Sequence, residues 1–217
     1  MKTRISTAFL LGCAALVFTG SACSVAGSDP APTPPGHEIF QLCAQCHGAA
    51  AGGNSLANAP SIAGLPQWYI EAQLKKFKAG GRGTHFDDQT GMQMRPMAMS
   101  LANDAEITAV SVYVAGLPAQ KPAATLTDGD AAKGQVSFAV CSACHGVDGS
   151  GNEQLKAPPL NHTNDWYLVR SLQKFKAGIR GTNPLDISGA GMRPMAQTLV
   201  DEQAVKNVVA YIGTLNK

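Results

Sequence analysis

The sequence predicts an all-α protein of two tandem helical domains related by duplication, and three observations support this fold class. The motif CAQCH, which starts at Cys43, returns as CSACH at Cys141, 98 positions later. The same offset holds without insertion or deletion over both copies, so that Phe40, for example, matches Phe138. Apolar residues also recur at helical spacing between the motifs. Two copies fall short of the three or more repeats that a solenoid needs, so we expect two globular domains.

Three helices are expected in each copy. The middle one has apolar residues at Ile70, Leu74 and Phe77 and ends before a glycine, which is a helix-stop signal. The last one starts with acidic residues, which the helix dipole favours. The expected ranges are 36–46, 67–79 and 104–115 in the first copy and 134–144, 165–177 and 201–214 in the second. Between the last two helices of each copy we expect a loop that contains glycine and methionine.

The start of the chain has the pattern of an export signal, with a basic start, an apolar run and small residues before Gly27. An uncleaved anchor is the alternative, as is lipidation at Cys23. Export predicts a periplasmic protein, which is either free or attached to the membrane through its N-terminus. The predicted organisation is a signal peptide (1–26), a Pro-rich tether (27–35), an N-terminal domain (36–117), a linker (118–127) and a C-terminal domain (128–217).

The C-x-x-C-H motif is a haem attachment signature. Its two thiols can form thioethers with one porphyrin, and the following histidine becomes the proximal iron ligand. The other two of the six cysteines, Cys13 and Cys23, fall in the signal. The predicted cofactors are two covalently bound haem c groups with their iron, and the alternative is two C-x-x-C disulfides. The attachment residues are Cys43, Cys46 and His47 in the first copy and Cys141, Cys144 and His145 in the second.

The second axial ligand of each iron is expected to be a methionine, because a thioether closes that face and raises the potential. Methionines without a counterpart in the other copy are set aside, which removes Met92 and Met99. Two matched pairs are left. We favour Met97 and Met195, which follow Arg-Pro shortly before the last helix, over the alternative pair of Met94 and Met192.

Some residues are expected to support the haems. A carbonyl at Pro60 and at Pro158 is placed to orient the proximal histidine, although each could equally be a plain turn proline. Arg82 and Arg180 either pair with haem propionates or are solvated. Two Trp-Tyr pairs, 68–69 and 166–167, either line a haem edge or pack in the core. His37, His85 and His162 have no repeat partners and are assigned no role.

The composition limits the class of partner. Without residues 1–26 the chain keeps 15 basic and 15 acidic residues, and no basic stripe supports nucleic-acid binding. The aromatic content is only 6%, which is easier to understand if porphyrins fill much of the core.

Taken together, the haem motifs, the Phe-Lys-Ala-Gly segments and the Met-Ala-x-x-Leu segments resemble dihaem class I c-type cytochromes, specifically the cytochrome c4 family. The resemblance covers about residues 36–217. It implies two class I cytochrome c domains packed head to head, each wrapped around one covalent haem, with propionates near their interface. It also supports Met97 and Met195 as ligands. The sequence departs from the family pattern in two places, the loop 181–186 with its proline and the Arg-Pro before each favoured methionine. Neither changes the expected iron ligands, but both bear on which redox partner the chain binds.

The function that follows is a periplasmic electron carrier of a respiratory chain, which passes electrons towards a terminal oxidase through two His/Met-ligated haems. Its partners would be redox proteins, an upstream reductase and the downstream oxidase. We expect no catalytic residues and no enzyme. The alternatives are a dihaem enzyme of the peroxidase or thiosulfate-oxidising type, which needs an open iron position, and a fixed electron-transfer subunit of a larger redox complex.

Overall fold

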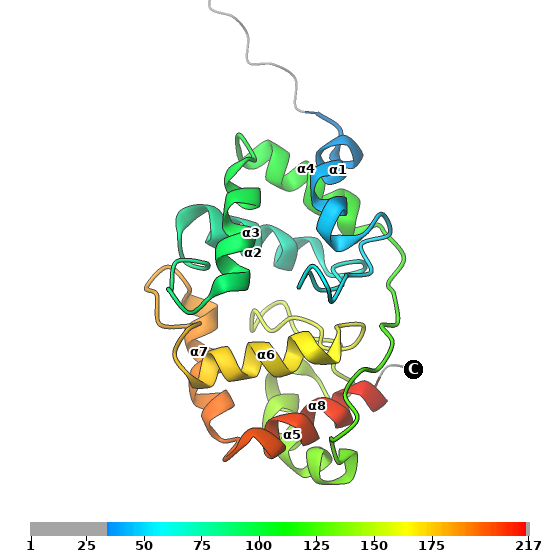
Figure 1. The fold of residues 1–217 in the computed structure, drawn as a ribbon, viewed down its shortest axis with the longest axis vertical. Coiled ribbons are helices and arrows are strands. Elements are labelled where there is room, and N and C mark those ends of the chain that lie inside the picture. The colour runs from blue at the N-terminus through cyan, green and yellow to red at the C-terminus, as the bar shows by residue number, and fades with distance from the viewer. Residues whose placement is uncertain (1–33, 216–217) are drawn as a thin grey trace, which may run out of the picture. The chain divides into compact units, whose positions relative to one another are not determined.

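The computed structural model describes residues 34–215, which fold into helices joined by loops (Figure 1). The helices are α1 (Gly36–His47), α2 (Gln67–Ala79), α3 (Gln89–Met99), α4 (Asp104–Ala115), α5 (Ala131–His145), α6 (Asp165–Lys176), α7 (Ile187–Gln197) and α8 (Glu202–Thr214). Within residues 34–215, extended pairing is limited to two isolated bridges, one in each copy. The all-α fold class is therefore confirmed.

The predicted signal peptide, Cys23 and most of the predicted tether lie outside the described residues. No helix in the described range is both long and apolar enough to cross a membrane. The stretch 118–127, which was predicted as a linker, contains no helix. Its end is held where α6 begins, because the amides of Thr125 and Leu126 donate to the Asp165 carboxylate at 2.5 and 2.7 Å.

Each copy is built around one close helix crossing, α1 on α4 and α5 on α8. Glycine makes these crossings possible. A Cβ at Gly36 would lie 2.1 Å from the Ala109 carbonyl oxygen, and one at Gly134 would lie 1.9 Å from that of Asn207. Both distances are far below van der Waals contact, so these positions accept only a residue without a side chain. The crossings fix the orientation of α1 and α5, whose last residues are the C-x-x-C-H motifs.

Repeated aromatic pairs pack beside these crossings. Phe40 is 1% exposed, and its ring centroid lies 5.4 Å from that of Tyr113. Phe138 is 3% exposed and lies 5.3 Å from Tyr211 in the same tilted arrangement. Apolar residues of the last helix, such as Ile107 and Val208, complete the two cores. The matched aromatic residues of the repeat are thus core residues of two equivalent modules, which we call module 1 (36–117) and module 2 (128–215).

The expected methionine loops are helical, so that part of the prediction is wrong. Helices α3 and α7 occupy these segments, with Pro96 and Pro194 inside them. Asp88 and Asp186 cap their N-termini by accepting, each at 3.1 Å, from the amides of Gly91 and Gly189. A capping carboxylate satisfies a helix donor, which offsets part of what the proline removes. The favoured methionines therefore lie on short capped helices.

Candidate haem centres

The proximal histidines end the first helix of each module and are held by the predicted proline carbonyls. His47 Nδ1 lies 2.8 Å from the Pro60 carbonyl oxygen, and His145 Nδ1 lies 2.8 Å from that of Pro158. A carbonyl can only accept, so Nδ1 must carry the proton and donate it. This confirms the predicted role of both prolines and leaves Nε2 of each ring with its lone pair.

Burial keeps both imidazoles neutral. The side chains of His47 and His145 are 7% and 5% exposed. Burial lowers the pKa of both histidines, and the hydrogen bond to the proline carbonyl offsets only part of that effect. A neutral imidazole with a fixed tautomer is the form that ligates iron, and an orienting acceptor on its other nitrogen is typical of metal-bound histidine.

The four motif cysteines are free thiols. Cys43 and Cys141 are half-buried, whereas Cys46 and Cys144 are exposed. Burial raises the pKa of the Cys43 and Cys141 thiols. Each module therefore has one thiol facing inward and one near solvent, which suits attachment of a porphyrin that lies along the end of the first helix.

Met97 and Cys43 line one cavity in module 1. The cavity has a volume of about 350 Å³ and lies between α1, α3 and the start of α4, with Glu38 and Glu106 also in its wall. Met94, the alternative ligand, packs instead against the hydrophobic core of the module. In module 2, Met195 is 37% exposed. The arrangement in module 1 favours Met97 over Met94, and ligation by Met97 and Met195 stays a prediction.

Arg82 and Arg180 are not solvated but buried, each 9% exposed. Their guanidinium groups lie over the rings of Phe77 and Phe175, at 4.2 and 4.3 Å from the centroids. The Nε atoms of both arginines are buried without a hydrogen-bond partner.

A buried cation needs an anion to be stable. Within the described residues no ion pair is formed by either Arg82 or Arg180. The two propionates of a haem are anions of the kind that the guanidinium fork binds in bidentate fashion. The donor set of each module, two thiols, a neutral imidazole, a thioether and a buried arginine, therefore fits haem c.

Two half-buried tyrosines, Tyr69 and Tyr167, complete the arginine cluster. Burial alone would raise the pKa of Tyr167, but the charges of Arg82 and Arg180 outweigh it and lower that pKa to about 7. The pKa of Tyr69 is raised by burial and by the neighbouring Tyr167. The two tyrosines influence each other, and both are close enough to Arg82 and Arg180 to feel their charge. An added anion would bring the pKa of Tyr167 back towards the ordinary value.

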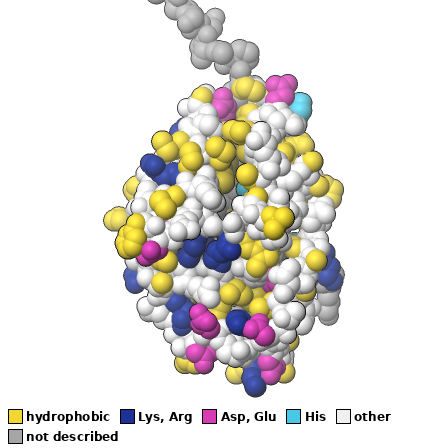
Figure 2. Space-filling model, viewed as in Figure 1, with side chains coloured by type: hydrophobic (Ala, Val, Ile, Leu, Met, Phe, Trp, Pro, Cys, Tyr) yellow, Lys and Arg dark blue, Asp and Glu magenta, His cyan; other side chains and the backbone are white. Residues whose placement is uncertain are grey.

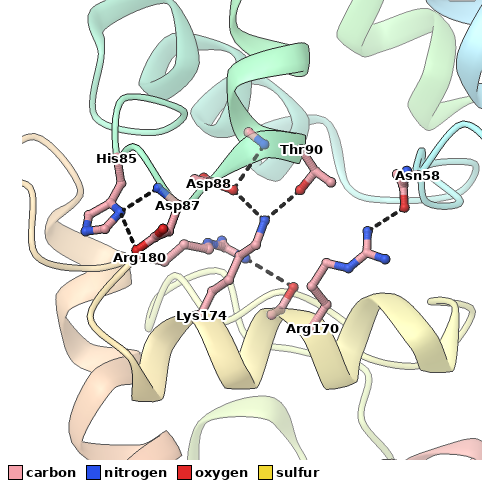
Figure 3. Close-up of polar contacts among 10 residues, drawn as sticks. Asn58, His85, Asp87, Asp88, Thr90, Arg170, Lys174 and Arg180 are labelled. Carbon is pink, nitrogen blue, oxygen red and sulfur yellow. Dashed lines mark hydrogen bonds and ion pairs between the residues drawn. The ribbon is translucent and has the colours of Figure 1, made fainter.

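Two reciprocal ion pairs join the modules, and sequence reasoning missed them. Lys76 Nζ of α2 lies 2.6 Å from an oxygen of Asp186 and 2.5 Å from the Ser188 hydroxyl. In the mirrored contact, Lys174 of α6 pairs with Asp88 (Figure 3).

Each lysine thereby reaches the capping aspartate of the other module's methionine-bearing helix. Lys174 also donates to the Thr90 hydroxyl at 2.6 Å, which matches the contact of Lys76 with Ser188. The available signal was the repeat itself, because both lysines and both aspartates recur at the 98-residue offset.

His37 and His85 contact neighbours within their own module. His37 lies against Tyr113 with ring centroids 6.4 Å apart. His85 accepts from the Asp87 amide at 3.2 Å (Figure 3). His162 has a left-handed backbone, with φ of 63°. Between residues 34 and 215, no three His, Cys, Asp or Glu side chains gather into a metal-binding group.

Comparison with known proteins gives a family match in both modules. The model of the family described as cytochrome c matches residues 34–118 and 131–216. The thiosulfate dehydrogenase electron acceptor of Stutzerimonas stutzeri is 31% identical over 94% of this chain and 94% of its own length.

Two solved structures are also similar. That of Acidithiobacillus ferrooxidans cytochrome c4 has a TM-score of 0.65 and 29% identity, over 81% of this chain and 99% of that one. That of the thiosulfate dehydrogenase of Marichromatium purpuratum has a TM-score of 0.66 and 30% identity. The match covers 84% of this chain but only 40% of that one. These findings confirm the resemblance to cytochrome c4 and the two tandem domains.

The expectation that the chain is no enzyme is contradicted by the same comparisons. One relative is named as the electron acceptor of thiosulfate dehydrogenase, and a similar structure is that of a thiosulfate dehydrogenase. The sequence reasoning went wrong because it judged the chain by its own iron ligands. An electron-transfer component can belong to an enzyme while the chemistry on the substrate takes place elsewhere in the assembly.

Proposed function

Because this chain belongs to the cytochrome c family, we propose that it is a dihaem component of a thiosulfate-oxidising system. In this role it accepts electrons from a thiosulfate dehydrogenase and passes them towards a terminal oxidase. The observation that carries the proposal is the similarity to a thiosulfate dehydrogenase electron acceptor over nearly the full length of both chains. The duplicated haem-binding domain supplies the two redox centres that such a carrier needs.

Each module would hold its haem with residues from two segments, the end of its first helix and the helix that carries the methionine. Cys43 and Cys46, or Cys141 and Cys144 in module 2, are the thioether sites at the end of the first helix. The proximal ligands are His47 and His145, and the distal ligands are Met97 and Met195. When bound, haem supplies an iron that cycles between the ferric and ferrous states.

The protein residues keep the ligand set fixed while the charge changes. The Pro60 and Pro158 carbonyls hold the proton on Nδ1 and fix the orientation of each imidazole. Burial excludes water from the histidines. Little therefore has to rearrange around a proximal histidine when an electron arrives, which favours rapid transfer.

The buried cluster of Arg82, Arg180, Tyr69 and Tyr167 is the binding site that we propose for the propionates. It holds two guanidinium groups with unpartnered Nε atoms and draws residues from both modules. Propionates held there would bring the edges of the two porphyrins to the boundary between the modules. Electrons could then pass between modules without leaving the protein. The predicted export signal, residues 1–26, supports a periplasmic location for this reaction.

The test is electron transfer from a defined donor. The oxidised holoprotein is mixed with purified thiosulfate dehydrogenase of Stutzerimonas stutzeri and with thiosulfate, and haem reduction is followed by absorption. We expect complete reduction of both haems only when the dehydrogenase is present. Parallel reduction by dithionite checks that both haems are reducible.

The other outcomes contradict the proposal in distinct ways. Reduction by thiosulfate alone would show that the chain oxidises the substrate itself and is more than an acceptor. No reduction with the dehydrogenase, in protein that dithionite reduces fully, would show that this donor is wrong.

A further inference from the structure

A second cavity lies where the two modules meet, away from the cysteines and methionines. It has a volume of about 450 Å³ and is lined by α2 of module 1 and, in module 2, by the loop at 155–156, by Leu185 and by the start of α7. The residues that matter for its character are Trp68, Ala72, Leu155, Lys156, Leu185 and Ile187. None of them belongs to the haem-ligand set.

The duplication provides an internal comparison for this cavity. The equivalent position around Trp166 has Arg170 where the cavity has Ala72. Arg170 donates to the Asn58 side chain at 2.9 Å (Figure 3). Its guanidinium group also lies over the Trp166 ring, 5.3 Å from the centroid. That long side chain covers the tryptophan on the equivalent side. Alanine at position 72 provides no such cover, and the cation over the Trp68 ring is instead the Lys156 ammonium of the other module.

The rim of the cavity is also more apolar than its equivalent. Leu155, Leu185 and Ile187 stand where module 1 has Ala57, Asp87 and Gln89. They are 54%, 57% and 83% exposed. Single exposed apolar residues need no explanation, but several around one cavity are typical of interaction sites. Apolar and basic side chains lie beside one another across the middle of the space-filling view (Figure 2).

Lys156 adds one uncompensated positive charge. Its ammonium group lies 5.6 Å from the centroid of the Trp68 ring, and it forms no ion pair with a carboxylate between residues 34 and 215. The other lysine of the cavity, Lys76, is already paired with Asp186.

The backbone at Lys156 points to a function for this side chain. Its φ is 55°, as is that of the equivalent Asn58. Asparagine tolerates the left-handed region better than lysine does. Lys156 therefore occupies a position that its backbone disfavours, with its ammonium group over the Trp68 ring. Such outliers often mark functional residues.

We propose that this cavity is the docking site for the electron-donating enzyme, and that the donor inserts an apolar side chain with a carboxylate beside it. The apolar group would fill the cavity between Trp68 and the apolar rim, and the carboxylate would pair with Lys156. A protein surface fits better than a small molecule, because the rim side chains stand in solvent where only a broad surface covers them. Tyr69 lines the cavity and belongs to the buried arginine cluster, so a donor docked here would lie beside the proposed propionate site.

This inference rests on the proposed function, and its test converts the cavity into its equivalent. The triple variant Leu155→Ala, Lys156→Asn, Ile187→Gln takes all three residues from module 1. The matched control is Gln89→Ala on the equivalent side. Full-length holoproteins are compared in the rate of haem reduction by Stutzerimonas stutzeri thiosulfate dehydrogenase at limiting concentration. The midpoint potentials of each variant check that the haem sites are intact.

We expect the second-order rate constant of haem reduction to fall at least about tenfold in the triple variant, with unchanged midpoint potentials. The Gln89→Ala control should be reduced at the wild-type rate. The two tryptophans provide a second measurement. The reduced protein is titrated with the dehydrogenase and followed by NMR spectroscopy. The indole N–H resonance of Trp68 should shift, and that of Trp166 should not.

Three results would overturn the proposal. If the dehydrogenase reduces wild type and triple variant at equal rates, the cavity is not the docking site, and the proposed acceptor function is unaffected. A wild type that is not reduced by the dehydrogenase at all would refute the acceptor function and, with it, this inference. Concentration-dependent self-association that the triple variant abolishes, with no change in reduction rate, would assign the cavity to a second copy of the chain.

Discussion

Replacing Lys174 by methionine tests how strongly the two modules are tied together. Lys174 belongs to α6, and its ammonium group contacts Asp88 and the Thr90 hydroxyl of module 1. Methionine keeps most of the apolar length of the side chain and removes the charge. The change leaves the Asp88 carboxylate, whose side chain is 3% exposed, without its cation.

The magnitude follows from this burial. Breaking a buried ion pair by removing one partner costs about 3–5 kcal/mol, because the remaining charge stays desolvated. Asp88 keeps its bond from the Gly91 amide at 3.1 Å, so we expect the lower end, about 3 kcal/mol. With a denaturant dependence of about 2 kcal/mol per molar urea, the unfolding midpoint should fall by about 1.5 M.

The assay is urea unfolding of the holoprotein followed by circular dichroism. Lys75→Met is the matched control, since Lys75 is on α2 and pairs with Asp104 at 3.1 Å with side chains 47% and 79% exposed. We expect that control to change stability by less than about 1 kcal/mol. Lys76→Met should reproduce the Lys174→Met effect, because its pair with Asp186 has the same geometry.

A change below about 0.5 kcal/mol for Lys174→Met would refute the reasoning, because exposed and screened pairs give values of that size. The double variant Lys174→Met, Asp88→Asn supplies a second criterion. It should be less destabilised than the sum of the two single changes, since the lost interaction is shared. Strict additivity would mean that the two side chains do not interact.

Three further predictions concern the ligands, the pH dependence and the helix crossing. Met97→Ala and Met195→Ala should each remove the long-wavelength band of Met-to-ferric-iron ligation from one haem only, whereas Met94→Ala should leave it unchanged; loss of the band in Met94→Ala would reverse the ligand assignment. Burial alone would raise the pKa of Asp88, but Lys174 and the Gly91 amide hold that pKa below its ordinary value. The ionised carboxylate of Asp88 therefore stabilises the folded state fully above about pH 4, and this stabilisation is lost as the pH falls through the lower folded-state pKa. Urea midpoints measured between about pH 3 and 6 should accordingly fall less towards acid in Asp88→Asn than in wild type, and parallel profiles would contradict this. Gly36→Ala should destabilise by about 1–3 kcal/mol, because the new Cβ would lie 2.1 Å from the Ala109 carbonyl oxygen, whereas Gly191→Ala, with nothing within 4 Å, should be neutral or stabilising in thermal unfolding.

Much of the fold could be predicted because the relevant signals are local or repeated. Helices α2 and α4 have the predicted ends, Gln67–Ala79 and Asp104–Ala115. The carbonyls of Pro60 and Pro158 could be anticipated because a proximal histidine needs a fixed acceptor. The repeat frame then selected the same residue in both modules.

The parts that could not be predicted depend on contacts that no local pattern records. Helices α3 and α7 were predicted as loops that contain glycine and methionine. Each also holds an internal proline, which usually ends a helix, and each is capped by an aspartate, Asp88 or Asp186. The contact of Lys76 with Asp186 spans 110 positions, which helical periodicity cannot detect. Burial of Arg82 and Arg180 likewise depends on how the modules pack against one another.

The most direct test of the account is a redox titration of the purified holoprotein with simultaneous absorption spectroscopy. The account predicts two haems per chain, both low-spin, with a methionine-to-iron band from each ferric haem that disappears on reduction. Two separate one-electron steps or one merged step both agree with it. A single haem, or one haem that is high-spin and lacks the methionine band, would contradict it.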